Sequence, residues 1–447
     1  MTIKALRTFF LAILICTTKS LLAQNPLITD QYTADPSARV FGDRVYVYPS
    51  HDIPPSPGKG RANWFVMEDY HVFSSENLTE WTDHGMIVHQ NSVPWVKPES
   101  YSMWAPDCIY RNGKYYFYFP SAPADSTIAR GFTIGVAVSD KPTGPFIPEA
   151  SPIKNVKGID PNVFIDKDGQ AYLYWSQGNI YGAKLKENML ELASEPVVLQ
   201  ELPTKGLKEG PYVFERNGKY YMTYPHVENK TERLEYAMGD NPLGPFKFSG
   251  VIMDESASGC WTNHQSIINF KKQWYLFYHH NDLSPNFDKN RSIRADSLSF
   301  NEDGTIRKVI PTLRGVGLTS AKKDIQIDRY SDLSDGASVD FLDTTKRMLG
   351  WKAKLNRKNA WIRYNAVDFG KTKLSKIVIN ALAQNASIIE LRADRVDGPL
   401  IGKAVLSTAG DWKVTTSAGV KIPTGIHDLF IVSKTNTEVS IDWVRFE

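Results

Sequence analysis

Five ionisable side chains recur along the first two thirds of the chain, each just ahead of a short apolar run. They lie 49 to 72 residues apart and are Asp35, Asp107, Asp160, Glu209 and His264. Carboxyl groups gathered in one place could hydrolyse a glycosidic bond, because that reaction needs a carboxylic acid and a carboxylate on opposite faces of the sugar. In an inverting enzyme the two groups stand roughly 6.5–9.5 Å apart, which leaves room for the attacking water.

The surroundings of these five residues, which we call heads, suggest different roles. Glu209 is the candidate general acid, because Gly-Pro follows it and nearby tyrosines could limit its solvation and raise its pKa. Asp35 suits the general base, and Asp160 would orient Glu209 and keep it protonated by its own charge. Asp107 follows Ala-Pro and is expected to support its loop. Any single head could instead cap backbone amides, since Asp-Pro and Asp-Gly also form turns.

Each head opens the same unit, which consists of an apolar strand, a polar turn and an aromatic strand. The clearest copy is EGPYVFERNGKYYMTY at 209–224, where Asn-Gly between two β-prone segments strongly indicates a hairpin. Repeats near 50 residues with several short strands each are typical of propeller blades. The first strand of each blade lies along the central axis, so the five heads are expected to converge on one end of the channel.

The repeat stops near residue 317, and a second run of short alternating strands continues to residue 447. Such strands with regular turns indicate a β-sandwich. The predicted fold is therefore all-β, with a five-bladed β-propeller over residues 24–318 and a β-sandwich (jelly-roll) domain over 319–447.

Residues 1–23 have a basic start, an apolar core and a small residue at the end, which predicts a cleaved signal peptide and a secreted or periplasmic protein. No other stretch is apolar for the roughly 18 residues that a membrane helix needs. The net charge of +3 belongs to three basic residues of this leader (Lys4, Arg7 and Lys19), and no basic patch indicates nucleic acid or anionic membranes as partners. Cys108 and Cys260 could form a disulfide or be two buried small hydrophobes.

The repeat resembles glycoside hydrolase family 43, whose members are five-bladed propellers that invert configuration at pentose-type substrates. By this resemblance, Asp35 in ADPSARVFGDRVYVY matches the base, Asp160 in GIDPNVFIDKDGQAYLYW the pKa-modulating aspartate, and Glu209 in KEGPYVFERNGKYY the acid. His264 in NHQSIINFKKQWYLFYH matches the central histidine near a water or metal ion on the axis. Arg291 matches an arginine that contacts substrate.

Trp104 in MWAPD resembles the family's subsite platform, on which a sugar ring could stack, although a channel-lining core aromatic is about as common. A long insertion between the first two heads could close the pocket to an exo-acting form or merely pack on the rim. Its aromatic residues are Trp64, Phe65, Trp95 and Tyr101. His51 and His226 could also lie at the rim of the pocket. A solvated or core histidine is the more ordinary interpretation of each.

The last third resembles carbohydrate-binding module family 6 in blocks such as WIRYNAVDFG, GIHDLFIVS and IDWVRF. Two departures bear on sugar binding. The block at Trp412 lacks a second tryptophan, and Ser440 replaces a ligand-contacting asparagine. The domain could therefore bind at another face or only brace the propeller. Such modules often hold a structural calcium ion, which acids near Asp335 or Asp442 could ligate.

These observations together predict a secreted, inverting exo-glycosidase that removes terminal pentosyl residues, α-L-arabinofuranosyl first, from plant cell-wall polysaccharides. Bond cleavage in this scheme needs no cofactor. The alternatives are a β-D-xylosidase or an exo-galactanase of the same fold, and a non-catalytic glycan-binding protein. A retaining transferase on the same propeller would hold its two carboxyls roughly 5–5.5 Å apart.

Overall fold

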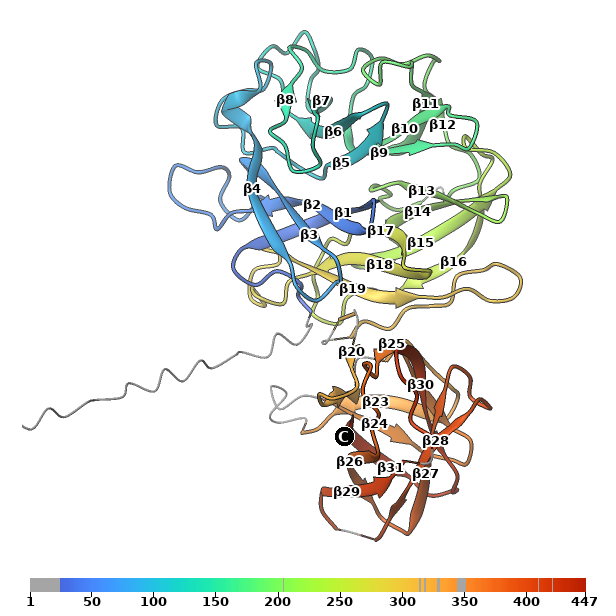
Figure 1. The fold of residues 1–447 in the computed structure, drawn as a ribbon. Helices are drawn as coiled ribbons and strands as arrows, with labels where there is room; N and C mark the ends of the chain where they lie inside the picture. Colours follow the sequence, from blue (N-terminus) through green and yellow to red (C-terminus); the bar gives the residue numbers. More distant parts are fainter. Residues whose placement is uncertain are drawn as a thin grey trace, which may run out of the picture.

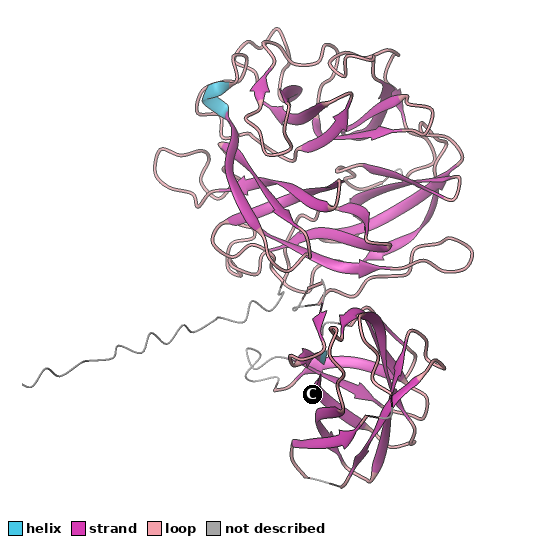
Figure 2. Ribbon diagram, viewed as in Figure 1, coloured by secondary structure: helices cyan, strands magenta, loops and turns pink. Residues whose placement is uncertain are grey.

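The computed structural model describes residues 25–203, 205–312, 315–316, 319–327, 330–343, 351–408, 410–419 and 421–447. The predicted signal peptide lies outside the described residues. The described elements are almost all strands, with one short 3-10 helix at Gln90–Ser92 (Figure 2). Within the described ranges, no helix is long and apolar enough to cross a membrane.

Five small antiparallel sheets form the larger domain, and each sheet follows the chain in order from its inner strand outwards (Figure 1). The first contains β1 (Tyr32–Phe41), β2 (Arg44–Asp52), β3 (Asp69–Ser75) and β4 (Thr82–His89). The second contains β5 (Asp107–Arg111), β6 (Lys114–Ser121), β7 (Thr133–Ser139) and β8 (Ile147–Pro148). The third contains β9 (Ile159–Ile165), β10 (Ala171–Gln177), β11 (Asn179–Lys184) and β12 (Val197–Val198). The fourth contains β13 (Tyr212–Arg216), β14 (Lys219–Val227), β15 (Glu232–Gly239) and β16 (Lys247–Met253), and the fifth β17 (Ser266–Phe270), β18 (Gln273–His280) and β19 (Ser292–Leu298).

Buried polar groups join the inner strands of the first four sheets. Ser37 Oγ on β1 donates a hydrogen bond to Asp107 on β5 (2.5 Å), and the same carboxylate accepts one from Val163 N on β9 (2.7 Å). Asn162 Oδ1 on β9 in turn accepts from Val213 N on β13 (2.9 Å). Each blade is therefore held to the next at the axis by a satisfied buried hydrogen bond.

The same kind of contact closes the ring. Gln265 Nε2, just before β17, donates to the carbonyl oxygen of Gly210 in the fourth blade (2.9 Å). Ser266 Oγ on β17 accepts from Ala38 N on β1 (2.9 Å), which joins the fifth blade to the first. The five sheets thus form a closed five-bladed propeller, as the repeat predicts.

The start of the described chain also belongs to the fifth blade. Leu27 N donates to Ile293 O on β19 (2.9 Å), and Thr33 N donates to Arg291 O (3.0 Å). The N-terminal segment therefore lies along the three-stranded blade and covers the outer strand, an edge that would otherwise expose unpaired backbone groups.

The smaller domain is a sandwich of two sheets. One contains β20 (Thr319–Ser320), β25 (Trp361–Asp368), β30 (Ile426–Ser433), β27 (Ser387–Ala393) and β28 (Leu400–Leu406), with β22 (Asp332–Leu333) paired to β25. The other contains β23 (Ala337–Phe341), β24 (Trp351–Leu355), β31 (Val439–Phe446), β26 (Lys376–Ala383) and β29 (Lys413–Ala418), with β21 (Ile325–Gln326) paired to β31.

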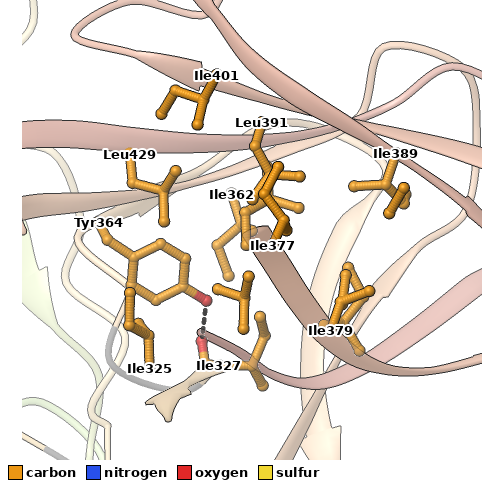
Figure 3. Close-up of a cluster of buried hydrophobic side chains, with 14 of the residues drawn as sticks. Ile325, Ile327, Ile362, Tyr364, Ile377, Ile379, Ile389, Leu391, Ile401 and Leu429 are labelled. Atoms are coloured by element: carbon orange, nitrogen blue, oxygen red, sulfur yellow. Dashed lines mark hydrogen bonds between the residues drawn. The ribbon is translucent and has the colours of Figure 1, made fainter. Parts of the chain in front are cut away.

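Inward-facing isoleucine and leucine side chains of both sheets fill the sandwich (Figure 3). The hydroxyl of Tyr364 within this cluster is satisfied, because Tyr364 Oη donates to Ile327 O (2.8 Å; Figure 3). The sandwich touches the propeller through polar contacts. Asn365 Nδ2 donates to Gln273 Oε1 (2.6 Å), and Arg307 pairs with Asp332 (3.1 Å).

Candidate active site

One end of the propeller axis opens into a cavity of about 220 Å³. This volume is below the roughly 300–1,000 Å³ of pockets for drug-sized ligands, and it suits an occupant of about one sugar ring. All six predicted site residues line the cavity, namely Asp35, Trp104, Asp160, Glu209, His264 and Arg291. Of the five heads, only Asp107 lies away from it.

Local backbone irregularities aim Asp35 and Asp160 into the cavity. The β1–β2 pairing shifts register between Ala34 and Ser37, and the β9–β10 pairing shifts between Tyr174 and Ser176, opposite Asp160. Asp35 and Asp160 have φ of 45° and 56°, in the left-handed region that non-glycine residues rarely adopt. A bulge of this kind redirects one side chain, and such strain is typical of functional sites.

The charged surroundings of Asp35 keep it ionised. Its carboxylate accepts hydrogen bonds from Arg291 Nη1 (2.8 Å) and Ser50 Oγ (2.7 Å). Burial opposes ionisation, but Arg291, His279, His264 and the Ser50 hydrogen bond together outweigh it and lower the pKa of Asp35 to about 2. Asp35 is therefore a carboxylate throughout the pH range in which most proteins work, as a general base must be.

Asp52 fixes the arginine that accompanies the base. Its carboxylate accepts from Arg291 Nε (2.9 Å), Nη2 (2.9 Å) and the backbone N–H (2.8 Å), while the guanidinium lies 4.7 Å from the ring centre of Phe65. Arg291 thus bridges Asp35 and Asp52. The sequence analysis missed Asp52, because it lies at the far end of β2 and not at the head of a repeat.

Three carboxyl groups gather around the candidate acid. Asp160 and Glu209 line the cavity, and Glu232 is buried outside its lining. Burial raises the pKa of Glu209, and burial together with the charges of Glu209 and Asp35 raises the pKa of Asp160. Glu232, which the sequence analysis also missed, shares a carboxyl–carboxyl hydrogen bond with Glu209, and its pKa is raised by burial and by Glu209. Buried like charges cannot all ionise cheaply, so the cluster retains protons that an acid catalyst could deliver.

Backbone amides hold two of these carboxyls. Gly210 N donates to Asp160 Oδ2 (2.9 Å), which favours the ionised form of Asp160, and Asn263 N donates to Glu232 Oε2 (2.6 Å). Gly210 has φ of 54°, and a Cβ there would lie 2.9 Å from Pro225 Cδ and 3.0 Å from His264 Nδ1. Only glycine fits beside the acid, which explains the Glu-Gly pair in the sequence.

Aromatic side chains form another part of the cavity wall. Trp104 packs against Phe132 at a ring separation of 4.5 Å, and Trp64 and Trp261 also line the cavity. Indole faces can stack on the apolar side of a sugar ring. Trp64 and Phe65 bring the predicted insertion to the pocket, whereas Trp261, from the segment before β17, was not foreseen.

The remaining candidates lie elsewhere. Trp95 stacks on Phe119 inside the second blade. The rim histidines pair with acids, His51 with Asp69 (2.6 Å) and His226 with Glu235 (2.9 Å).

The disulfide alternative is wrong in this structure, because Cys108 and Cys260 are both free and buried.

The surroundings of His264 do not build a metal site from protein ligands. Its Nδ1 lies 3.9 Å from Asp35 Oδ1, and burial lowers the pKa of the imidazole. Among the described residues, no third histidine, cysteine or carboxylate completes a ligand group there. The same holds for Asp335, which is almost fully exposed, and for Asp442, which accepts from Asn380 Nδ2 (2.9 Å). Calcium in the sandwich therefore stays a prediction.

A propeller that gathers buried carboxyls and tryptophans around a pocket of this size has the site of a glycoside hydrolase. The model of glycosyl hydrolases family 43 matches residues 23–306, and the chain belongs to that family. The model of carbohydrate binding module family 6 matches residues 331–447, so the sandwich is a module of that kind.

Several relatives share the propeller. A xylosidase/arabinosidase from Humicola insolens is 37% identical over 63% of this chain and 98% of its own length, and one from Bacteroides ovatus is 36% identical over 63% and 95%. A family 43 β-xylosidase/α-arabinofuranosidase from a compost metagenome, solved with xylotriose in a calcium-free form, is 36% identical with a TM-score of 0.57 and covers 64% of this chain and 97% of its own. An arabinoxylan arabinofuranohydrolase from Bacillus subtilis (24% identical, TM-score 0.55) shares the fold over 94% of this chain and 97% of its own.

Proposed function

We propose that this glycoside hydrolase is an inverting exo-enzyme that removes single terminal pentosyl residues, α-L-arabinofuranosyl and β-D-xylosyl, from plant cell-wall polysaccharides. The observation that carries the proposal is the contrast between two carboxyl groups that line one small cavity. Asp35 is held ionised, while Glu209 lies in a buried cluster that retains protons. Inversion requires one protonated carboxylic acid and one ionised carboxylate at the same pH.

In this mechanism Asp35 takes a proton from water as the water attacks the anomeric carbon. Glu209 gives its proton to the leaving oxygen, and Asp160 orients Glu209 and opposes its ionisation. Arg291 holds Asp35 in place and keeps it charged. The aromatic wall stacks on the sugar. Residues of this chain supply every proton transfer in the scheme.

The choice of sugars rests on similarity. The sequence alone favours α-L-arabinofuranose, and the names of the relatives pair xylose with arabinose. Terminal residues of these two pentoses can present similar shapes to one pocket. The small cavity supports exo-action, since a chain interior would need an open groove. The predicted leader supports export, and the family 6 module supports a polymeric substrate.

Release of 4-nitrophenol tests the substrate class. We expect turnover of both the α-L-arabinofuranoside and the β-D-xyloside. The matching hexosides should be hydrolysed roughly 10–200-fold more slowly, because one extra hydroxymethyl group in a closed pocket costs about 1–3 kcal/mol. Proton NMR of the first product should show the anomer inverted from the substrate. A retained anomer would reject the mechanism, and absence of turnover on the pentosides and on arabinoxylan would reject the substrate class.

A second prediction concerns pH. The assigned role makes Asp160 the ionised member of this pair, with its carboxylate held by Gly210 N. Asp160→Asn then removes a negative charge beside Glu209, so the pKa of Glu209 should fall and the basic limb of the kcat/KM profile should move to lower pH. We expect kcat/KM at neutral pH to drop at least about tenfold. The acidic side should stay unchanged, because Asp35 titrates near pH 2. Asp168→Asn, in an exposed turn of the same blade, is the matched control, and an unmoved basic limb in Asp160→Asn would contradict the assigned role.

A further inference from the structure

Two histidines and an aspartate meet on the first blade, outside the cavity and unused by the mechanism. His51 lies near the end of β2, and Asp69 and His71 lie at the start of β3 (Figure 1). Each can offer one ligand atom, and the three atoms lie within 4.8 Å of one another. We propose that His51, Asp69 and His71 bind one transition-metal ion, with Zn²⁺ the expected occupant.

The distances suit a first-row metal after a small adjustment. Zn–N and Zn–O bonds are roughly 2.0–2.2 Å, so ligand atoms in a tetrahedral site stand about 3.4 Å apart. His51 Nδ1 and Asp69 Oδ1 are now hydrogen-bonded at 2.6 Å, and the rings of His51 and His71 are 5.1 Å apart. The three side chains are half-buried, with exposures of 21%, 14% and 18%. They are thus ordered by packing and still reachable from solvent.

A second carboxylate fixes one of the ligands. Asp83 on β4 lies 3.1 Å from His71 Nδ1, which leaves the other ring nitrogen of His71 for the metal. Asp83 is itself held by Gln31 Nε2 (3.0 Å) and by Gly85 N (2.7 Å). A carboxylate that orients a histidine ligand and is in turn hydrogen-bonded is typical of zinc sites.

The donor set also selects the metal. Two imidazoles and one carboxylate suit zinc, nickel, copper or cobalt, whereas calcium and magnesium prefer oxygen ligands. The fourth position would be open to water. Because β2 and β3 are adjacent strands of one blade, an ion here would clamp the first blade at the side that carries Asp52, the partner of Arg291.

The test is equilibrium dialysis of the full chain, stripped with a chelator, against excess ZnCl₂, with metal measured by mass spectrometry. We expect about one more Zn²⁺ per wild-type chain than per His71→Ala chain. His84→Ala is the matched control, because His84 is an exposed histidine on β4 that contacts Ser74. It should bind as the wild type does. CaCl₂ should show no difference between wild type and His71→Ala.

A stability measurement gives an independent readout. Zn²⁺ at a hundredfold excess over its Kd should raise the melting midpoint of wild type and His84→Ala by roughly 5 °C, and should leave that of His71→Ala unchanged. Asp69→Asn, which keeps the shape of the side chain, provides the same comparison if His71→Ala fails to fold. Equal zinc content in wild type, His71→Ala and Asp69→Asn, or no zinc in the wild type, would overturn the proposal.

Discussion

Glu209→Gln should lower kcat on an unactivated substrate such as xylobiose by about 10²–10⁴-fold, the usual contribution of general acid catalysis. The amide keeps the shape of the side chain and has no proton to give to the leaving oxygen. A 4-nitrophenyl glycoside has a leaving group that departs without protonation, so the loss there should be much smaller. The ratio of the two losses, measured as kcat on both substrates, identifies the acid.

Asp35→Asn is the matched comparison. The base acts on the attacking water and not on the leaving group, so its removal should slow both substrates to a similar extent, again by about 10²–10⁴-fold. Circular dichroism and melting curves of both variants should establish that they fold. The two roles are wrongly assigned if Glu209→Gln lowers kcat equally on the two substrates. They are also wrongly assigned if Asp35→Asn leaves kcat on the 4-nitrophenyl glycoside unchanged.

The sequence predicted the propeller because its signals are local. Each hairpin carries its own turn, as at Asn217-Gly218, and each inner strand begins with a head whose position along the axis follows from the repeat. The structure therefore places Asp35, Asp160, Glu209 and His264 around one cavity, as the repeat led us to expect.

Two carboxylates that the sequence did not reveal act through partners on other segments of the chain. Asp52 and Arg291 are 239 positions apart, and Glu232 reaches Glu209 from the next hairpin, without a motif of its own. The bulges that turn Asp35 and Asp160 inward are likewise a property of strand pairing. Repeat spacing predicts which strands are inner strands, but it does not determine which side chains of neighbouring strands meet behind a catalytic group.

Repeat spacing also did not predict the contacts of Asp107, whose substitution has the largest expected effect on stability. It is a head by sequence, yet it lies beneath the cavity as a junction of three blades. Its carboxylate accepts hydrogen bonds from Ser37 Oγ, Arg39, Asn162 Nδ2 and Val163 N and is almost fully buried. Every one of these partners is a donor, so the site requires an acceptor on both oxygens.

Asp107→Asn should therefore destabilise the propeller by about 3–5 kcal/mol. The new amide points an N–H₂ group at donors and leaves the largely buried Arg39 guanidinium without its counter-charge. For a domain of this size we expect the melting midpoint to fall by roughly 6–10 °C. Asp140→Asn, at an exposed pair with Lys114, is the matched control and should change the midpoint by no more than about 1 °C.

The same variant separates support from catalysis. Asp107 does not line the cavity, so well below its melting point Asp107→Asn should hydrolyse the 4-nitrophenyl pentosides with kcat within roughly threefold of wild type, unlike Asp35→Asn and Glu209→Gln. A variant that melts with the wild type but loses turnover would make Asp107 part of the reaction. A variant that melts early and keeps turnover would establish that one head of the repeat serves the ring itself, because a closed propeller needs a buried link between blades as much as it needs a cavity.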